Sequence, residues 1–267
     1  MSTATHTATR MATSTAGHAL GDSLTMLRRN LKHALRYPSL TFAVVVTPVM
    51  MLLLFNYAYG STLGAGIGGG HYIDYVTPGI VLMAATSGAL VTAIGICTDM
   101  TEGIVNRFRT MAISRSAFLA GHVVGSVIQT MIGLVLVVGT ALAMGFRPNA
   151  GPVEWLAAAG LLLFLTIALT WISAGIGLVA KTVESASNMP MPLQFLPFIG
   201  SAIVPTDSMP TALRWFAEYQ PFTPMIETLR GLLLGTGIGT SAWIALAWCT
   251  ALTLVGYFWS RSVFYRR

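Results

Sequence analysis

VTPGIVLMAATSGALVTAIGIC, residues 76–97, contains no charged side chain. A helix needs about 20 predominantly apolar residues to cross the ~30 Å hydrocarbon layer of a membrane, and this stretch has that length. Five further apolar stretches lie before and after it, at residues 40–59, 118–146, 155–180, 189–205 and 241–260. Because a lipid-exposed chain must satisfy its own backbone hydrogen bonds, these stretches predict an all-α membrane protein with six transmembrane helices.

The basic residues are distributed unevenly between the loops that join these six stretches. If the chain crosses the membrane six times, twelve of its 15 Lys and Arg residues share the side of the N-terminal segment. Since cytoplasmic loops carry an excess of Lys and Arg, this bias predicts that both termini are cytoplasmic. The three on the other side are Arg147, Arg214 and Arg230.

Composition supports a membrane protein and argues against a nucleic-acid-binding protein. Hydrophobic residues make up 54% of the chain and charged residues 9%, whereas soluble domains carry about 25% charged residues. The net charge of +6 follows the alternation of loops and forms no continuous face, so it favours anionic lipid over nucleic acid as the partner. Cys97 and Cys249 lie in or at the end of apolar stretches and resemble small hydrophobic residues, so no metal site is predicted.

The N-terminal region divides into a tail and an amphipathic helix. Residues 1–21 are rich in Ser, Thr and Ala and predict a disordered cytoplasmic tail. Residues 22–37 place leucines at helical spacing opposite several basic residues, and Pro38 ends the pattern. This pattern predicts a helix that lies in the membrane interface, with its basic residues among lipid phosphates. The alternative is a helix whose solvated basic face packs on a partner. One transmembrane domain is expected over residues 22–267.

The loop DMTEGIVNRFRTM at residues 99–111 predicts a short amphipathic helix on the cytoplasmic face. Asp99 is expected to cap its start, and Glu102, three residues on, to complete a capping box. Ile104, Phe108 and Met111 form an apolar stripe at helical spacing. Such a helix either anchors the loop to the membrane or presents a surface to a soluble partner.

The region of residues 189–234 departs from the pattern of straight membrane helices. Four prolines interrupt residues 190–205, and broken helices at membrane depth are tolerated where they are buried in protein or line a cavity. Residues 209–216 and 224–234 are too short to cross the membrane and predict two re-entrant helices in the outer leaflet. Glu227 and Arg230, at positions i and i+3, are expected to pair for a few tenths of a kcal/mol.

The polar residues near the apolar stretches bear on two other classes of function. A proton-coupled secondary transporter normally carries ionisable residues deep within its spans, but the acidic residues here fall in loops or at span ends. An intramembrane hydrolase is suggested by His122 and Ser126, four residues apart, although no third orienting group is recognisable. His122 lies near a span end and is expected to be interfacial or hydrogen-bonded. No catalytic residue is predicted.

Two segments resemble the permease subunits of ABC-2 type exporters, especially the daunorubicin/doxorubicin-resistance group of actinobacteria. The first contains Glu102-Gly103 and Arg107-Phe108-Arg109, followed by a serine- and arginine-containing turn at residues 114–116. The second runs from residue 192 to residue 224 and ends in QPFTP. The resemblance covers nearly all of residues 20–267. It departs at Ala112, where the family commonly has proline.

The resemblance implies a permease that binds no cofactor itself and works with a separate ABC ATPase subunit carrying ATP and Mg²⁺. These 267 residues contain no G-x-x-x-x-G-K-[ST] phosphate loop. A second permease copy, identical or different, is expected to pair with this one in the bacterial plasma membrane. The residues implied to contact the ATPase, through a coupling helix between the second and third spans, are Glu102, Gly103, Arg107, Phe108 and Arg109.

The resemblance also implies a substrate path between two permeases, near the second and fifth spans. A hydrophobic drug, a lipid or a lipid-linked glycan is the expected substrate. Apolar and flexible side chains suit such a path, although ordinary helix packing explains their presence equally well. The candidate path residues are Met83, Gln194, Phe195 and Phe198.

Overall fold

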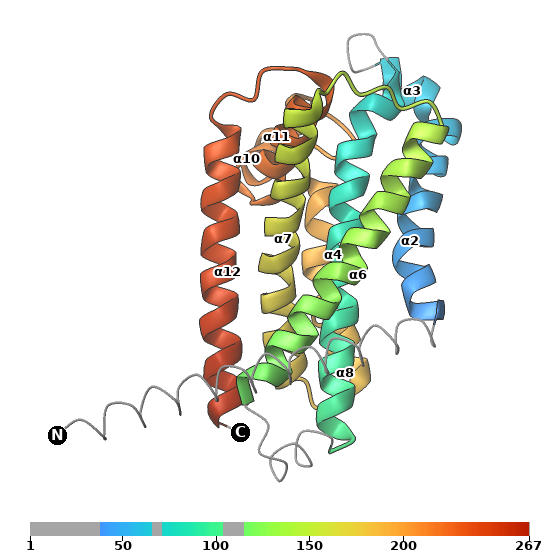
Figure 1. Cartoon of the computed structure of the whole chain (residues 1–267). Helices are drawn as coiled ribbons and strands as arrows, with labels where there is room; N and C mark the ends of the chain where they lie inside the picture. The colour runs from blue at the N-terminus through green and yellow to red at the C-terminus, as the bar shows by residue number, and fades with distance from the viewer. Residues whose placement is uncertain (1–37, 66–70, 104–114, 267) are drawn as a thin grey trace, which may run out of the picture.

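The computed structural model describes residues 38–65, 71–103 and 115–266, and throughout these ranges the regular elements are helices (Figure 1). The predicted N-terminal tail, the interfacial helix at residues 22–37 and most of the loop at residues 99–111 lie outside them.

Within the described ranges, four helices are long and apolar enough to cross a membrane. Each corresponds to one of the six predicted spans. They are α4 (Tyr72–Thr101), α6 (Arg115–Ala143), α7 (Pro152–Val179) and α12 (Ser241–Arg266). The chain is therefore a multi-pass membrane protein. The count of six crossings stays a prediction.

The first predicted span forms α2 (Pro38–Leu53), which continues into a π-helical turn, η1 (Leu54–Ala58). Pro48 lies inside α2, and a π-helical turn follows one and a half turns later. A short helix, α3 (Gly60–Gly64), then leads towards α4.

The fifth predicted span is divided into short pieces. These are α8 (Val183–Asn188), α9 (Met191–Phe195) and a 3₁₀ turn, η3 (Leu196–Ile199), followed by a second 3₁₀ turn, η4 (Thr206–Ser208). Prolines lie at the start of α9 and within η3, where each removes a backbone donor and so interrupts a continuous helix. Two further helices, α10 (Thr211–Tyr219) and α11 (Phe222–Leu234), precede α12.

The loops alternate between the two ends of the bundle (Figure 1). The start of α2, the C-terminal end of α4, the start of α6, α8 and the C-terminal end of α12 lie at one end. We call this the inner end. The outer end carries α3, the α6–α7 connection, α10 and α11. Lys181, Arg261 and Arg266 belong to inner-end segments, as the sequence pattern requires.

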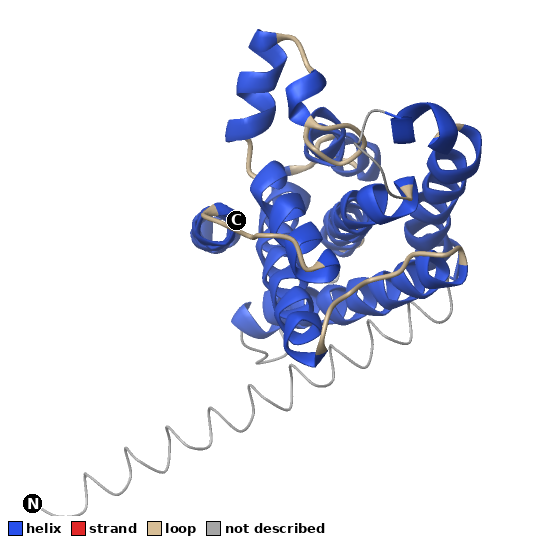
Figure 2. Cartoon of the chain, turned by 90° about the horizontal axis from the view of Figure 1, so that it is seen from above, coloured by secondary structure: helices blue, strands red, loops and turns tan. Residues whose placement is uncertain are grey.

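Helix α4 lies inside the bundle, in contact with α2, α6 and α7. Of its most apolar window, 78% is buried within the chain, against 17% for α12. Viewed along the helices, α12 stands at the edge of the bundle (Figure 2), where it packs on α7. Its exposed Trp and Phe side chains suit contact with lipid.

Candidate functional site

The predicted coupling residues begin where α4 ends at the inner end. Glu102 is exposed, and its backbone N–H donates to the Thr98 carbonyl at 2.9 Å. Gly103 follows with φ +69°, a left-handed conformation that glycine adopts readily and that ends helices. Helix α4 therefore stops at this pair. Arg107, Phe108 and Arg109 lie outside the described residues.

Asp99 has a different role from the predicted one. It lies inside the last turn of α4, is 8% exposed, and its Oδ2 is 3.0 Å from Nε2 of His122 on α6. The capping-box hypothesis with Glu102 is wrong, because α4 runs through Asp99 instead of starting a new helix there. His122 is hydrogen-bonded, as predicted.

The Asp99–His122 contact ties the inner ends of two membrane helices together. Both side chains are 11% exposed, and a hydrogen bond to a carboxylate is stronger than one between two neutral groups. The two residues lie on the helices immediately before and after residues 104–114. The contact therefore links α4 and α6 near their inner ends.

The segment of residues 180–186 lies beside the same end of α4. The Cys97 thiol donates to the Ala180 carbonyl at 3.8 Å, and Cys97 packs with Ala186. The Thr182 hydroxyl accepts from the Ser185 N–H at 3.1 Å and caps α8. The inner end thus carries a second segment near the end of α4, exposed at residues 181–184.

The candidate path residues separate into two environments. Met83 is 5% exposed within the core. The Ser87 hydroxyl donates to the Met83 carbonyl at 3.0 Å, and Gln194 Nε2 donates to the Ser87 hydroxyl at 3.1 Å. Ser87 on α4 therefore links the Gln194 side chain to the backbone of Met83. Phe195 is 56% exposed on the outside of the chain, with its ring 6.1 Å from that of Phe198.

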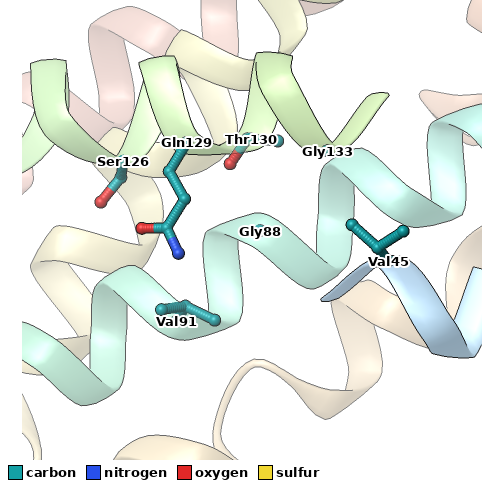
Figure 3. A pocket seen from close by; sticks show the side chains of 7 residues that line it. All are labelled: Val45, Gly88, Val91, Ser126, Gln129, Thr130 and Gly133. Carbon is teal, nitrogen blue, oxygen red and sulfur yellow. The ribbon is translucent and has the colours of Figure 1, made fainter. Parts of the chain in front are cut away.

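A small, open cavity with room for about one water molecule lies between α2, α4 and α6. The side chains of Ser126 and Gln129 extend from α6 towards α4 (Figure 3). Val45 and Val91 supply apolar walls, so the cavity combines hydroxyl and amide groups with hydrocarbon. The remaining lining residues are Gly88, Thr130 and Gly133.

Residues 23–234 match the model of the ABC-2 type transporter family. The chain belongs to the ABC-2 type transporter family. The resemblance read from the sequence is thereby confirmed.

Three relatives illustrate how this ABC-2 chain compares with named proteins. It is 27% identical to the daunorubicin resistance ABC transporter permease protein DrrB1 of Streptomyces coeruleorubidus, over 90% of this chain and 84% of that one. It is 22% identical to the probable doxorubicin resistance ABC transporter permease protein DrrC of Mycobacterium tuberculosis, over 81% and 76%. It is 25% identical to the inner membrane transport permease YadH of Escherichia coli, over 75% and 79%.

Sequence reasoning undervalued one residue of this ABC-2 chain. The predicted pair of Glu227 and Arg230 forms at 2.8 Å, but Arg230 is buried and also reaches two other segments. The sequence indicated the importance of Arg230 only by placing this basic residue three positions after Glu227 in an otherwise apolar helix.

No metal centre is found in the part of this ABC-2 chain that the structure describes. Across residues 38–65, 71–103 and 115–266, no three His, Cys, Asp or Glu side chains gather closely enough to hold a metal ion.

Proposed function

We propose that this chain is the membrane-spanning permease subunit of an ATP-driven ABC exporter in the bacterial plasma membrane, with both termini in the cytoplasm. The observation that carries the proposal is membership of the ABC-2 family over residues 23–234. The alternation of basic residues between the two ends of the bundle supports the orientation. ATP and Mg²⁺ bind to a separate ABC ATPase subunit.

The energy of ATP binding enters the permease through the junction between α4 and α6. Glu102, Gly103, Arg107, Phe108 and Arg109 contact the ATPase subunit. Closure of the ATPase pushes on this segment, and the Asp99–His122 hydrogen bond makes the ends of α4 and α6 move together. Nucleotide can shift the permease between two states only by its differential affinity for them, so the coupling segment must contact the ATPase differently in each.

The transport path runs beside α4 and the broken fifth segment, between this permease and a second copy. Met83, Gln194, Phe195 and Phe198 are the residues proposed to line it. The substrate is a hydrophobic drug, a lipid or a lipid-linked glycan. The drug-resistance names of two relatives support the first of these, and the exposed apolar side chains of α12 suit contact with lipid.

Replacing Phe108 or Arg107 with alanine tests the coupling segment. We expect substrate-stimulated ATP hydrolysis by the reconstituted permease–ATPase complex to fall by roughly 30-fold, as for loss of an interface residue contributing about 2 kcal/mol. Insertion of the permease into the membrane should be unchanged. Arg261→Ala is the matched control, because Arg261 is an exposed inner-end residue on α12 outside the coupling segment. Normal coupled hydrolysis in both loop variants would show that the assignment is wrong.

Two alternatives gain an observation from the structure. Asp99 supplies His122 with a carboxylate, the third group that an intramembrane hydrolase requires. Together, Asp99 and His122 form an ionisable pair of the kind that proton-coupled transporters use. Export that persists in Ser126→Ala argues against the hydrolase. Export that stops without the ATPase subunit, while a proton gradient is maintained, argues against the proton-coupled transporter.

A further inference from the structure

Arg230 is a charged side chain buried at the outer end of the bundle, far from the coupling segment along the helices. It lies on α11, and its side chain is 10% exposed. An isolated charge in such a position is very unfavourable unless it is paired and hydrogen-bonded. The contacts of its guanidinium group therefore indicate what this charge is for.

The guanidinium group of Arg230 joins three segments. Its Nη2 donates to the Ser201 carbonyl at 2.7 Å and to the Tyr75 carbonyl at 3.2 Å. Its Cζ lies 3.8 Å from the centre of the Tyr75 ring, a cation–π contact. Its Nη1 donates to Glu227 Oε1 at 2.8 Å. Arg230 thus links α11 to the first turn of α4 and to the turn that follows η3.

The turn at residues 200–203 is seated directly on α4. Ser201 and Ala202 are 1% and 0% exposed. A Cβ added at Gly79 would lie 2.6 Å from the Ala202 Cα, so backbone touches backbone here. The Tyr72 hydroxyl donates to the Ile203 carbonyl at 2.9 Å. A molecule moving between α4 and the broken fifth segment cannot leave at this end unless the turn separates from α4.

We propose that Arg230 is a positioning residue that latches the turn at residues 200–203 onto α4 and keeps the outer end of this interface closed. Its part in transport rests on the proposed function, whereas the latch itself depends only on the geometry. We call the contact of Arg230 with Tyr75 and Ser201 the outer latch.

The placement of Glu227 makes the outer latch reversible. Glu227 lies on the same helix as Arg230, and its side chain is 42% exposed. When α11 separates from α4 and the turn, the ion pair travels with α11, and Arg230 gives up only its hydrogen bonds to two carbonyl oxygens and its packing on an aromatic face. Opening therefore never leaves a buried charge without its counter-ion, which would be strongly destabilising.

A cysteine at Ser201 reports whether the latch is closed. The Ser201 hydroxyl is buried with no hydrogen-bond partner among the described residues, so Ser201→Cys removes no described side-chain hydrogen bond. The purified protein in detergent is treated with a polar maleimide, which reaches both ends of the molecule. We expect slow labelling of Ser201→Cys. Adding Arg230→Met should accelerate it by about tenfold or more, the effect of losing a hydrogen bond to a charged group.

Matched variants separate the latch from a general loss of structure. Arg214→Met is the control, because Arg214 on α10 is 45% exposed and pairs with Asp207 and Glu218; the labelling rate should stay unchanged. The native Cys97 and Cys249 are both fully buried, so their labelling marks an unfolded variant. If Arg230→Met unfolds by this criterion, Arg230→Lys takes its place, since lysine cannot form the forked contact.

A folded Arg230 variant that labels no faster than its parent overturns the latch. This measurement needs neither ATPase nor substrate, so its outcome is independent of whether the chain exports anything. The role in transport is tested by adding the ATPase subunit and a non-hydrolysable ATP analogue to Ser201→Cys alone. Faster labelling with the analogue supports the role, and an unchanged rate excludes it.

Discussion

Gly79→Ala is expected to lower the melting temperature of the detergent-solubilised protein by about 5–10 °C, corresponding to roughly 2–3 kcal/mol. The new methyl carbon would lie 2.6 Å from both Cα and Cβ of Ala202 and 2.7 Å from its carbonyl oxygen. No rotamer change relieves these clashes, because the colliding atoms are backbone or Cβ. The turn at residues 200–203 must move away from α4.

Gly95→Ala is the matched control, since Gly95 lies on the same helix and a Cβ there meets no atom within 4 Å. This change should be neutral or slightly stabilising, because alanine favours a helix over glycine by about 1 kcal/mol. Thermal unfolding followed by the fluorescence of a thiol-reactive dye measures both variants. Equal melting temperatures for the two would contradict the close packing of the turn on α4.

Asp99→Ala is expected to reduce the free energy of unfolding by about 1–3 kcal/mol, since removing one partner of a buried hydrogen bond leaves the other unsatisfied. It should also reduce substrate-stimulated ATP hydrolysis in the complex, because α4 and α6 lose the hydrogen bond that makes their inner ends move together. Asp99→Asn should lose less, since the amide oxygen still accepts a hydrogen bond from His122.

Glu102→Ala is the positional control for the stability measurement on Asp99→Ala. Glu102 lies three residues away but is exposed, so its replacement should change the stability by no more than about 0.5 kcal/mol. A double-mutant cycle between Asp99→Ala and His122→Ala measures the coupling energy directly. A coupling energy near zero would show that the 3.0 Å contact does not join the helices energetically.

The long helices were predictable because a membrane crossing is a property of local composition. The apolar stretch at residues 76–97 marks α4, but the helix itself runs from Tyr72 to Thr101. Its extra turns carry Asp74 and Asp99, polar residues that a count of apolar side chains excludes. The structure satisfies them elsewhere: Asp74 accepts from the Arg147 N–H at 3.1 Å, and Asp99 from His122.

The role of Asp99 was misjudged, and that of Arg230 was predicted only in part, for the same reason. Within a few residues of sequence, Asp99 has a suitable Glu102 for a capping box, and Arg230 has Glu227 for a weak helical pair. Neither local pattern contains the partners on distant segments. His122 is 23 residues from Asp99, and Tyr75 is 155 residues from Arg230.

Hydrophobic length and the placement of basic residues were therefore enough to establish the membrane class, the alternation of the loops and, through two motifs, the resemblance to ABC-2 permeases. The transfer of a helix into lipid and its orientation in the membrane depend on the composition of that segment and its flanking loops, which can be read from the sequence. Only the tertiary structure decided that α4 is enclosed, that Asp99 meets His122, and that Arg230 holds the turn at residues 200–203. Those interactions depend on which distant segments share a surface, and no periodicity within one segment encodes that choice.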